Sequence, residues 1–374
     1  MKFTIRILLA TWMTTSCTAM AAEPRSAAPG KTESVAPPLN THPWTPEQAG
    51  QWYAKRPWIV GCNYIPSTAV NWTEMWQKDS FDEATMDREL GYAAGLGMNT
   101  VRVFFQFLVW EFDREGFGQR FERFLTIADK HGIAVVPVLF DDCEIGVYGG
   151  EPFLGKQPDP LPGQMFSSWV PSPGHRRSEI PAQFPLFKEY VQSIIRRHAH
   201  DKRVLMWDLF NEVGGHNRQE KSYPLLEASF AWAQEINPDQ PITACLMVWH
   251  DPKFKKIVGL LTAQSDIITF HSYAAEKPFR EHLTQMRAFG RPVICTEWLA
   301  RGYGSKVETH LPLMRDQNVG AINWGLVNGR SQTHFAWGKK LPEPKVWHHD
   351  LLKKDGTPYN QGEATLFRRL TGKQ

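Results

Sequence analysis

The sequence lacks several features that would place it in familiar protein classes. Beyond residue 22 it has no run of about 20 apolar residues, the length that crosses a bilayer, so we expect no permanent membrane span. It has no basic block either, since the net charge is +3 over 374 residues and Lys and Arg are scattered among Asp and Glu. Nucleic acid is therefore not a favoured partner.

Signatures of cofactor binding and of serine chemistry are absent as well. No GxGxxG turn follows the first predicted strand, and no GxSxG elbow occurs, which disfavours a dinucleotide-binding sheet and a serine hydrolase. None of the five cysteines has CxxC spacing, and no His/Cys cluster resembles a zinc site, so we predict neither a cofactor nor a metal ion. Because Cys62, Cys245 and Cys295 fall in or at the end of predicted strands, buried thiols are favoured over disulfides.

The first 44 residues have the composition of segments outside a folded domain. Residues 1–22 combine a basic start, a short apolar stretch and small residues at the end, which predicts a secretory signal peptide and export to the periplasm or beyond. Lipid anchoring at Cys17 is a less favoured alternative, because Thr14 stands where a leucine is expected. Residues 23–44 are rich in Pro, Ser, Ala and Thr and indicate a flexible leader. The folded domain is expected over residues 45–374.

In that domain, short β-branched or apolar runs alternate with amphipathic stretches of helical spacing, which is typical of βαβ units and a parallel sheet. Eight strand–helix units predict a single-domain α/β protein with the (β/α)₈ or TIM-barrel fold. The predicted strands cover residues 59–66, 100–106, 134–141, 204–212, 242–249, 267–273, 292–298 and 320–327. The predicted helices cover residues 87–96, 119–131, 186–200, 225–236, 279–289, 307–318 and 364–370. Several of them precede a glycine or asparagine that predicts a helix end, namely Gly97, Gly132, Asn237, Gly290 and Asn318.

A long irregular segment, residues 142–183, separates the third strand from its helix. Loops of this length in a folded domain are usually functional, and a βα loop lies on the face where barrel active sites form. We therefore predict that it forms one wall of a cleft, with a purely structural Ω-loop as the alternative. The chain also has 15 tryptophans, whose flat faces suit sugar rings, although many are expected simply to pack in the core.

Two predicted strands deliver a carboxylate to the catalytic rim of the barrel. The fourth ends in Asn211 and Glu212, and the seventh ends near Glu297. Strands four and seven face each other across a barrel mouth, so the two side chains can flank one bond. Glycoside cleavage needs such a pair: a separation of about 5 to 5.5 Å gives retention, and about 6.5 to 9.5 Å gives inversion. For either residue alone, a salt bridge to a helix would be the simpler interpretation.

These residues resemble those of the retaining glycoside hydrolases of clan A, close to the family 5 cellulases and mannanases, over residues 58–372. The resemblance implies a retaining β-glycosidase that cleaves O-glycosidic bonds of an oligo- or polysaccharide by double displacement. It also implies that Glu212 is the acid/base, that Glu297 is the nucleophile, and that Asn211 holds the sugar 2-hydroxyl.

Four further positions match the same family. Arg102 resembles the strand-two arginine beside the nucleophile, and His271 and Tyr273 resemble a histidine that contacts substrate and a tyrosine that hydrogen-bonds the nucleophile. Trp324 resembles the tryptophan under the sugar at the cleavage point. Each has a structural alternative: a barrel ion pair for Arg102, a core histidine for His271, and interior packing for Trp324.

Two more candidates for sugar binding lie at strand ends. Asp141 closes the third strand, next to Asp142, and either binds sugar hydroxyls or belongs to a solvated acidic turn. Trp249 closes the fifth strand and is a second candidate. The adjacent histidines His348 and His349 have no spaced carboxylate partner, so a metal site there is disfavoured.

The charge pattern predicts how the carboxylates share a proton. Arg102 and Tyr273 are expected to keep Glu297 anionic, while the nearby anion raises the pKa of Glu212. Two other functions stay open: a transglycosylase that uses the same site, and a non-catalytic carbohydrate-binding barrel. The long loop and the segment after the eighth strand favour a pocket for chain ends or short oligosaccharides over an open cleft.

Overall fold

The computed structural model describes residues 43–147, 151–338 and 341–373. The predicted signal peptide and nearly all of the predicted leader lie outside the described residues. The strands are β1 (Val60–Asn63), β2 (Thr100–Phe104), β3 (Ala134–Asp141), β4 (Trp207–Asn211), β5 (Ile242–Thr243), β6 (Ile268–His271), β7 (Val293–Glu297) and β8 (Gly320–Trp324). The α-helices are α1 (Pro46–Ala54), α2 (Trp72–Trp76), α3 (Glu83–Gly95), α4 (Phe107–Phe112), α5 (Arg114–Lys130), α6 (His175–Ser178), α7 (Phe184–Arg197), α8 (Tyr223–Gln234), α9 (Lys255–Gln264), α10 (Glu276–Arg287), α11 (Val307–Asp316) and α12 (Gln361–Thr371). Within these ranges no helix is both long and apolar enough to cross a membrane.

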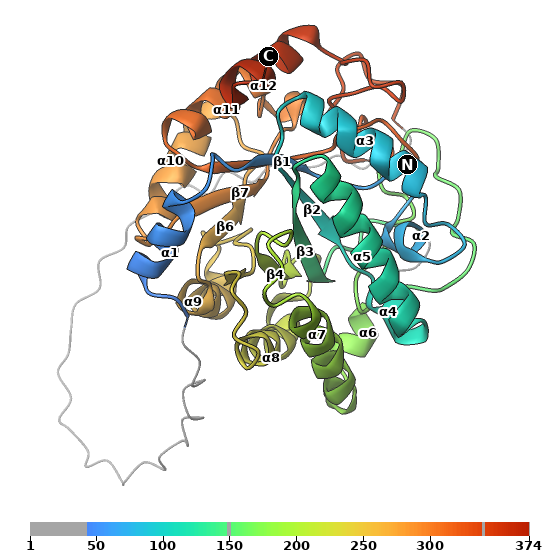
Figure 1. Cartoon of the computed structure of the whole chain (residues 1–374), viewed down its shortest axis with the longest axis vertical. Helices are drawn as coiled ribbons and strands as arrows, with labels where there is room; N and C mark the ends of the chain where they lie inside the picture. Colours follow the sequence, from blue (N-terminus) through green and yellow to red (C-terminus); the bar gives the residue numbers. More distant parts are fainter. Residues whose placement is uncertain (1–42, 148–150, 339–340, 374) are drawn as a thin grey trace, which may run out of the picture. The chain divides into compact units, whose positions relative to one another are not determined.

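The eight strands are parallel and follow the order β5-β4-β3-β2-β1-β8-β7-β6, so β1 pairs with β8. A parallel bridge between Leu246 and Phe270 links β6 to the chain after β5, and the Leu246 amide donates to the Thr269 carbonyl at 2.8 Å. The helices surround the strands, as Figure 1 shows. The predicted (β/α)₈ barrel is confirmed.

Close strand packing explains one residue choice in the barrel wall. Gly61 in β1 pairs with Thr100 in β2, and a Cβ atom at position 61 would lie 1.8 Å from the Thr100 carbonyl oxygen. Since that contact is impossible, any larger residue would have to push β1 and β2 apart. Glycine at this position therefore allows the two strands to approach.

The predicted helix ends are confirmed by the backbone. A residue with positive φ ends a helix because it adopts the left-handed conformation, which glycine and asparagine tolerate best. All five predicted stop residues have a positive φ, at Gly97 (82°), Gly132 (69°), Asn237 (52°), Gly290 (69°) and Asn318 (51°).

Two elements, β5 and α1, differ from the prediction. The fifth strand covers only Ile242–Thr243 instead of 242–249; after it, an isolated bridge joins Leu246 to Phe270, and Met247 and Trp249 line a cavity. None of the predicted helices precedes the first strand, whereas α1 lies there. The start of α1 carries a capping box, in which Thr45 and Gln48 bond each other's backbone amides. This capping box is the sequence signal from which α1 could have been predicted.

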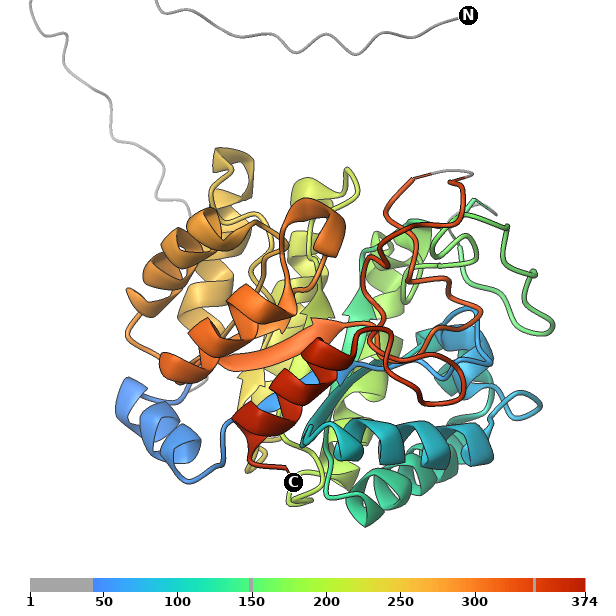
Figure 2. The same ribbon diagram turned by 90° about the horizontal axis from the view of Figure 1, so that it is seen from above.

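The long loop of residues 142–183 packs against the segment that follows β8. Figure 2 shows the loop in green beside this segment in red. Backbone hydrogen bonds join the two, from the Phe166 amide to the Ser331 carbonyl (2.9 Å) and from the Leu341 amide to the Gly163 carbonyl (2.8 Å). Short helical turns, α6 and η1 (Pro181–Gln183), interrupt the loop before α7 begins. The two irregular segments therefore form a joint wall on one side of the rim.

Candidate active site

A cavity of about 610 Å³ opens at the carboxyl ends of the strands, and we call it the rim cavity. Both Glu212 and Glu297 line it. The predicted cleft-wall loop contributes as well, so the interpretation of residues 142–183 as a wall is confirmed. The loop residues in the lining are Cys143, Glu144, Ile145, Phe166 and Trp169.

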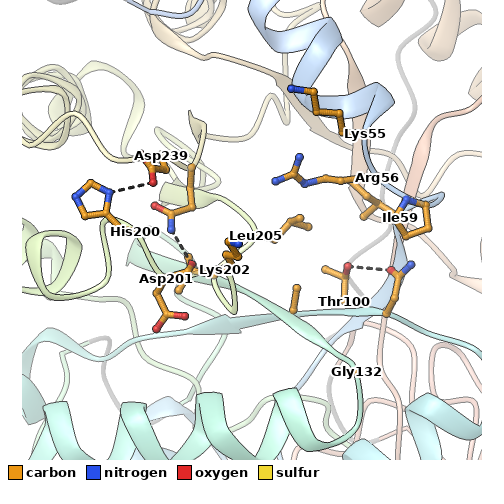
Figure 3. Close-up of a pocket in the computed structure, with 15 residues that line it drawn as sticks. Lys55, Arg56, Ile59, Thr100, Gly132, His200, Asp201, Lys202, Leu205 and Asp239 are labelled. Carbon is orange, nitrogen blue, oxygen red and sulfur yellow. Dashed lines mark hydrogen bonds and ion pairs between the residues drawn. The ribbon is translucent and has the colours of Figure 1, made fainter.

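A second cavity of about 730 Å³ lies at the opposite end of the barrel, where the strands begin (Figure 3). Its two acidic residues are already paired: Asp201 contacts Arg203 at 2.7 Å, and Asp239 contacts His200 at 3.0 Å. This end of a TIM barrel ordinarily serves stability, and active sites form at the other end. The larger cavity therefore offers no carboxylate pair for catalysis.

The two glutamates meet as the sequence predicts. Carboxylate oxygens of Glu212 and Glu297 and a ring nitrogen of His271 all lie within 4.8 Å of one another. Glu297 is the last residue of β7, and Glu212 directly follows β4. The backbone of Glu212 has a φ of 47°, a strained conformation for a non-glycine residue that turns its side chain at the strand end. Strain of this kind is common at functional sites.

Glu297 is held by a cation and a hydroxyl group. Arg102 donates from Nη1 to Oε1 of Glu297 at 3.0 Å, and the Tyr273 hydroxyl donates to Oε2 at 2.7 Å. His271 Nδ1 lies 3.4 Å from the same Oε2 atom. These contacts fix the carboxylate and leave it facing the rim cavity.

Arg102 is fully buried and contacts residues on three other strands. From β2 it donates to Asp208 on β4 at 2.9 Å and to Asn63 on β1 at 2.8 Å, in addition to Glu297 on β7. Its Nη2 also donates to the Oδ1 atom of Asn211 at 2.7 Å. Arg102 therefore forms an ion pair inside the barrel with Asp208 and also contacts Glu297, the predicted nucleophile.

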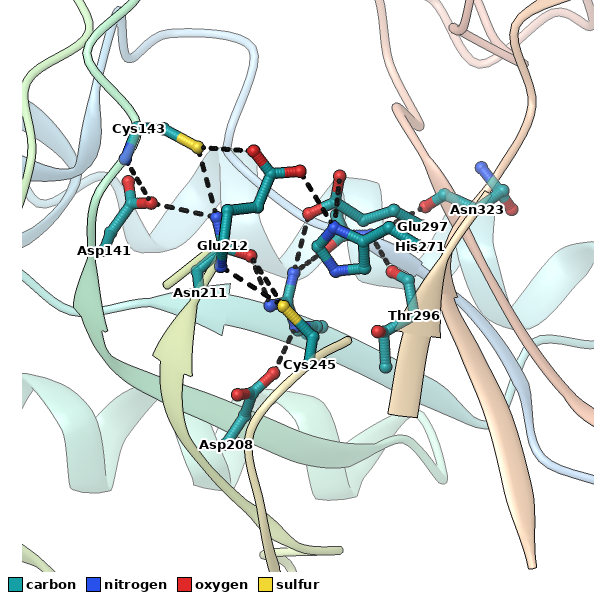
Figure 4. Close-up of polar contacts among 12 residues, drawn as sticks. Asp141, Cys143, Asp208, Asn211, Glu212, Cys245, His271, Thr296, Glu297 and Asn323 are labelled. Atoms are coloured by element: carbon teal, nitrogen blue, oxygen red, sulfur yellow. Dashed lines mark hydrogen bonds and ion pairs between the residues drawn. The ribbon is translucent and has the colours of Figure 1, made fainter. Parts of the chain in front are cut away.

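Glu212 has a different set of neighbours (Figure 4). His271 Nδ1 lies 3.0 Å from its Oε1 atom, and the Cys143 thiol donates to its Oε2 atom at 3.0 Å. His216 Nε2 lies 3.8 Å from Oε2. The Glu212 amide donates to the sulfur of Cys245 at 3.2 Å. Two histidines and the Cys143 thiol therefore lie against this carboxylate, while the Cys245 sulfur contacts the backbone of the same residue.

The pKa values of the pair follow from burial and from these neighbours. Burial raises the pKa of Glu297 to about 7. The negative charge of Glu212 also raises this pKa, whereas the positive charges of His271 and Arg102 lower it. The pKa of Glu212 is lowered: burial alone would raise it, but His216 and His271 outweigh burial. This order is opposite to the one expected from the sequence, because two histidines face Glu212. His271 Nδ1 lies between the two carboxylates, 3.0 Å from Glu212 and 3.4 Å from Glu297.

Asp141 is a buried supporting residue. It is 2% exposed, and its Oδ1 atom accepts from Asn211 Nδ2 at 2.9 Å while Oδ2 accepts from Trp169 Nε1 at 3.0 Å. Burial raises its pKa to about 6. The interpretation as a solvated acidic turn is wrong, because the carboxylate is enclosed by the loop that carries Trp169. Asp141 orients Asn211, the residue that resembles the 2-hydroxyl ligand.

Aromatic side chains form much of the cavity wall. Trp324 at the end of β8 lines the cavity and packs against Phe166 and Trp169, with ring centroids 5.6 and 6.0 Å away. Trp249 lies on the wall with Nε1 bonded to Gln285 at 2.7 Å. Trp337 also lines the cavity and packs edge-on against Tyr273 at 4.9 Å.

Sequence reasoning missed several residues at this site. Cys143, His216 and Trp337 come from loops, whose course depends on tertiary contacts rather than on strand spacing. The only available signal for Cys143 was its position two residues after a predicted strand end. Asp208 could have been found, because it alternates with residues 207 and 209 in a predicted strand and points inward.

Comparison with known proteins gives likenesses in structure alone. No protein-family model and no curated protein matches the sequence. Among solved structures, a GH5_18 enzyme from Streptomyces cattleya in complex with Manβ1-4GlcNAc aligns with a TM-score of 0.58 and 17% identity, covering 84% of this chain and 81% of that chain. The chain has the fold of the family 5 glycoside hydrolases. The resemblance stated from the sequence is confirmed at the level of the fold.

Two other family 5 structures agree with this. An exo-β-1,4-mannosidase from Opitutaceae bacterium strain TAV5 aligns with a TM-score of 0.56 and 19% identity, over 84% of this chain and 60% of that chain. The endo-β-1,4-mannanase from Thermotoga petrophila aligns with a TM-score of 0.55 and 12% identity, over 86% of this chain and 77% of that chain. At these identities the likeness shows the architecture alone.

Proposed function

We propose that the protein is a retaining β-glycosidase that cleaves O-glycosidic bonds by double displacement. The observation that carries the proposal is the pair Glu212 and Glu297, whose carboxylate oxygens lie within 4.8 Å of each other in the rim cavity. A close pair favours retention, because an inverting enzyme needs room for a water molecule between the carboxyl groups.

In the first step, Glu297 attacks the anomeric carbon while Glu212 gives its proton to the leaving oxygen. In the second step, Glu212 takes a proton from water, and that water releases the sugar from Glu297. Arg102 and Tyr273 stabilise the carboxylate that leaves in this step. His271 Nδ1 lies 3.0 Å from Glu212 and 3.4 Å from Glu297, so it can carry the shared proton to Glu212 before the first step.

Substrate binding is assigned to the groups around the pair. Trp324 would lie under the sugar at the cleavage point, with Trp249 as a further contact on the wall. Asn211 would hold the 2-hydroxyl. His271 Nε2 is buried and has no protein partner among the described residues, so a sugar hydroxyl is its expected partner.

For the sugar itself, a β-mannoside at a chain end or in a short oligosaccharide is our candidate. Three family 5 structures of the same fold are named for mannoside ligands or for mannosidase and mannanase activity. The joint wall of residues 142–183 and the segment after β8 supports a pocket over an open groove.

We also propose that the protein is exported; the mass of the mature N-terminus from producing cells would test cleavage near residue 22.

The decisive experiment combines substitution with chemical rescue. Glu297→Ala and Glu212→Ala should each abolish most turnover of an aryl β-mannoside. Added azide should give the α-glycosyl azide with Glu297→Ala and the β-glycosyl azide with Glu212→Ala, because azide replaces the nucleophile in one case and the attacking water in the other. A 2-fluoro mannoside should label Glu297, which peptide mass spectrometry would locate.

Three results would point elsewhere. Label on another residue would refute the assigned roles. Sugar transfer to an added acceptor in preference to water would indicate a transglycosylase. Binding of oligosaccharides without turnover by the wild type, over a panel of aryl β-glycosides, would indicate a carbohydrate-binding barrel.

A further inference from the structure

One side of the acid/base residue brings together three different metal-ligating groups. Cys143 Sγ lies 3.0 Å from Glu212 Oε2, and His216 Nε2 lies 3.8 Å from the same oxygen. One ligand atom from each side chain lies within 4.8 Å of the other two. All three residues line the rim cavity, and the His216 side chain is 30% exposed, so ions in solvent can reach them.

We propose that Cys143, Glu212 and His216 form a binding site for a thiophilic divalent cation, for which Zn²⁺ is the best match. Thiolate, imidazole and carboxylate are the three ligand types that zinc takes in proteins. Three protein ligands with a fourth position open to a cavity is an arrangement that zinc adopts in proteins. Binding replaces the proton of the Cys143 thiol, which is released to solvent.

An acidic residue and an amide support the three side chains. Asp141 is next to the site, since its Oδ1 atom accepts from the Cys143 amide at 3.0 Å. Asn211 Nδ2 donates to the Cys143 sulfur at 3.4 Å and would orient it as an outer-shell partner. Among the described residues, no lysine or arginine is bonded to Cys143, Glu212 or His216.

Two other groups of ligating side chains in the described ranges lack this advantage. Glu297 and His271 also approach Glu212, but Arg102 is bonded to Glu297 at 3.0 Å and opposes a second cation. In the group of Glu122, His198 and Asp201, Arg203 contacts both carboxylates at 2.7 Å. The Cys143 group is therefore the one that a free cation can enter without displacing an arginine.

Occupation of this site has a functional consequence that rests on the proposed function. Glu212 bound to a metal ion can neither donate a proton to the leaving oxygen nor accept one from water. Zinc should therefore act as a reversible inhibitor, and a chelator should restore activity. Sequence spacing cannot reveal this site, because Cys143 and Glu212 are 69 positions apart and only the fold brings them together.

The test uses the mature protein, reduced and stripped of metal. Co²⁺ should produce the near-ultraviolet charge-transfer absorption of a cobalt–thiolate bond, and isothermal titration should give one Zn²⁺ per chain. Cys143→Ser and His216→Gln should weaken Zn²⁺ binding by at least about 100-fold, above the 10–100-fold carried by outer-shell partners. Cys143→Ser should also abolish the cobalt–thiolate band. His250→Ala, which changes a histidine of the same cavity outside the group, should leave both signals unchanged.

The readouts separate this site from the proposed function. The site would be overturned if the cobalt–thiolate band persisted in Cys143→Ser. It would also be overturned if His250→Ala reduced zinc affinity as much as His216→Gln does. Circular dichroism would confirm that each variant is folded, and Cys143→Ala and His216→Ala provide second substitutions at the same positions. If the wild type has no glycosidase activity, the proposed function fails while absorption and titration still decide the site. If glycosidase activity stayed unchanged at saturating zinc, the proposed inhibition would be refuted.

Discussion

Tyr273→Phe removes a single hydrogen bond at the candidate nucleophile. The Tyr273 hydroxyl donates to Glu297 Oε2 at 2.7 Å, and its ring packs against Trp337 and His349, with centroids 4.9 and 5.6 Å away. Phenylalanine keeps the ring in place and removes the donor. The substitution therefore isolates the contribution of the hydroxyl group.

The expected size of the effect follows from that bond. A hydrogen bond to a charged group is worth about 1.5 to 3 kcal/mol. Since about 1.36 kcal/mol corresponds to a tenfold change in rate, kcat/KM should fall by about 10- to 150-fold. The hydrogen bond from Tyr273 also lowers the pKa of Glu297, so its loss should raise that pKa. Because the attack needs anionic Glu297, the acid limb of the pH profile should move to higher pH.

The assay is steady-state hydrolysis of an aryl β-mannoside between pH 4 and 9. Tyr53→Phe is the matched control, because it removes a hydroxyl bonded to the Asn318 carbonyl at 3.1 Å, away from the two glutamates. Its kcat/KM should stay within about twofold of wild type, since surface and remote changes seldom reach the site. A Tyr273→Phe enzyme with wild-type kcat/KM, or with an acid limb displaced to lower pH, would refute the role given to this hydroxyl.

Three further outcomes are expected. Arg102→Met should lower the free energy of unfolding by about 3–5 kcal/mol in urea titrations, because it leaves the buried carboxylates of Asp208 and Glu297 without their cation. Arg56→Met, at the other end of the barrel, is the control. An equal loss of stability in Arg56→Met would contradict this reasoning. Burial raises the pKa of Asp350 from its ordinary 3.8 to about 7, so its contribution to stability is complete below pH 4 and is lost as pH rises through 7. Asp350→Asn should therefore match wild type at pH 4 and gain up to about 4 kcal/mol at pH 8, at 1.36 kcal/mol per pKa unit; a gain of equal size at both pH values would exclude this titration as the cause. Trp337→Ala should raise KM by about 2- to 10-fold, because an aromatic contact contributes about 0.5–1.5 kcal/mol. Tyr303→Ala, which changes the exposed ring stacked on Trp337, serves as the comparison. An unchanged KM in Trp337→Ala would show that Trp337 does not contact the substrate.

The sequence was sufficient to predict the parts of the site that the strands position. Glu212, Glu297, Arg102 and Tyr273 lie at or near the carboxyl ends of strands, and parallel strands in a barrel bring such ends to one rim. Their meeting follows from the count and order of the strands, so it needed no knowledge of loop conformation.

The parts supplied by loops could not be predicted in the same way. Cys143 reaches Glu212 and Trp169 encloses Asp141 because the loop of residues 142–183 packs on the segment after β8, and those contacts have no periodic signal in the sequence. The proton distribution was predicted in the wrong order for the same reason. His216 follows β4 on a turn with a φ of 50°, and its approach to Glu212 depends on that backbone conformation.

The position of Arg102 has a consequence for how this molecule can be altered. One guanidinium group holds the walls of the barrel together from inside and also sets the charge of the group proposed to attack the sugar. Rigidity and turnover are therefore not independent properties here. Efforts to make the scaffold more heat-resistant by replacing polar residues of its interior with apolar ones would remove the reactivity along with the charge, whereas changes confined to the outer helices leave both in place.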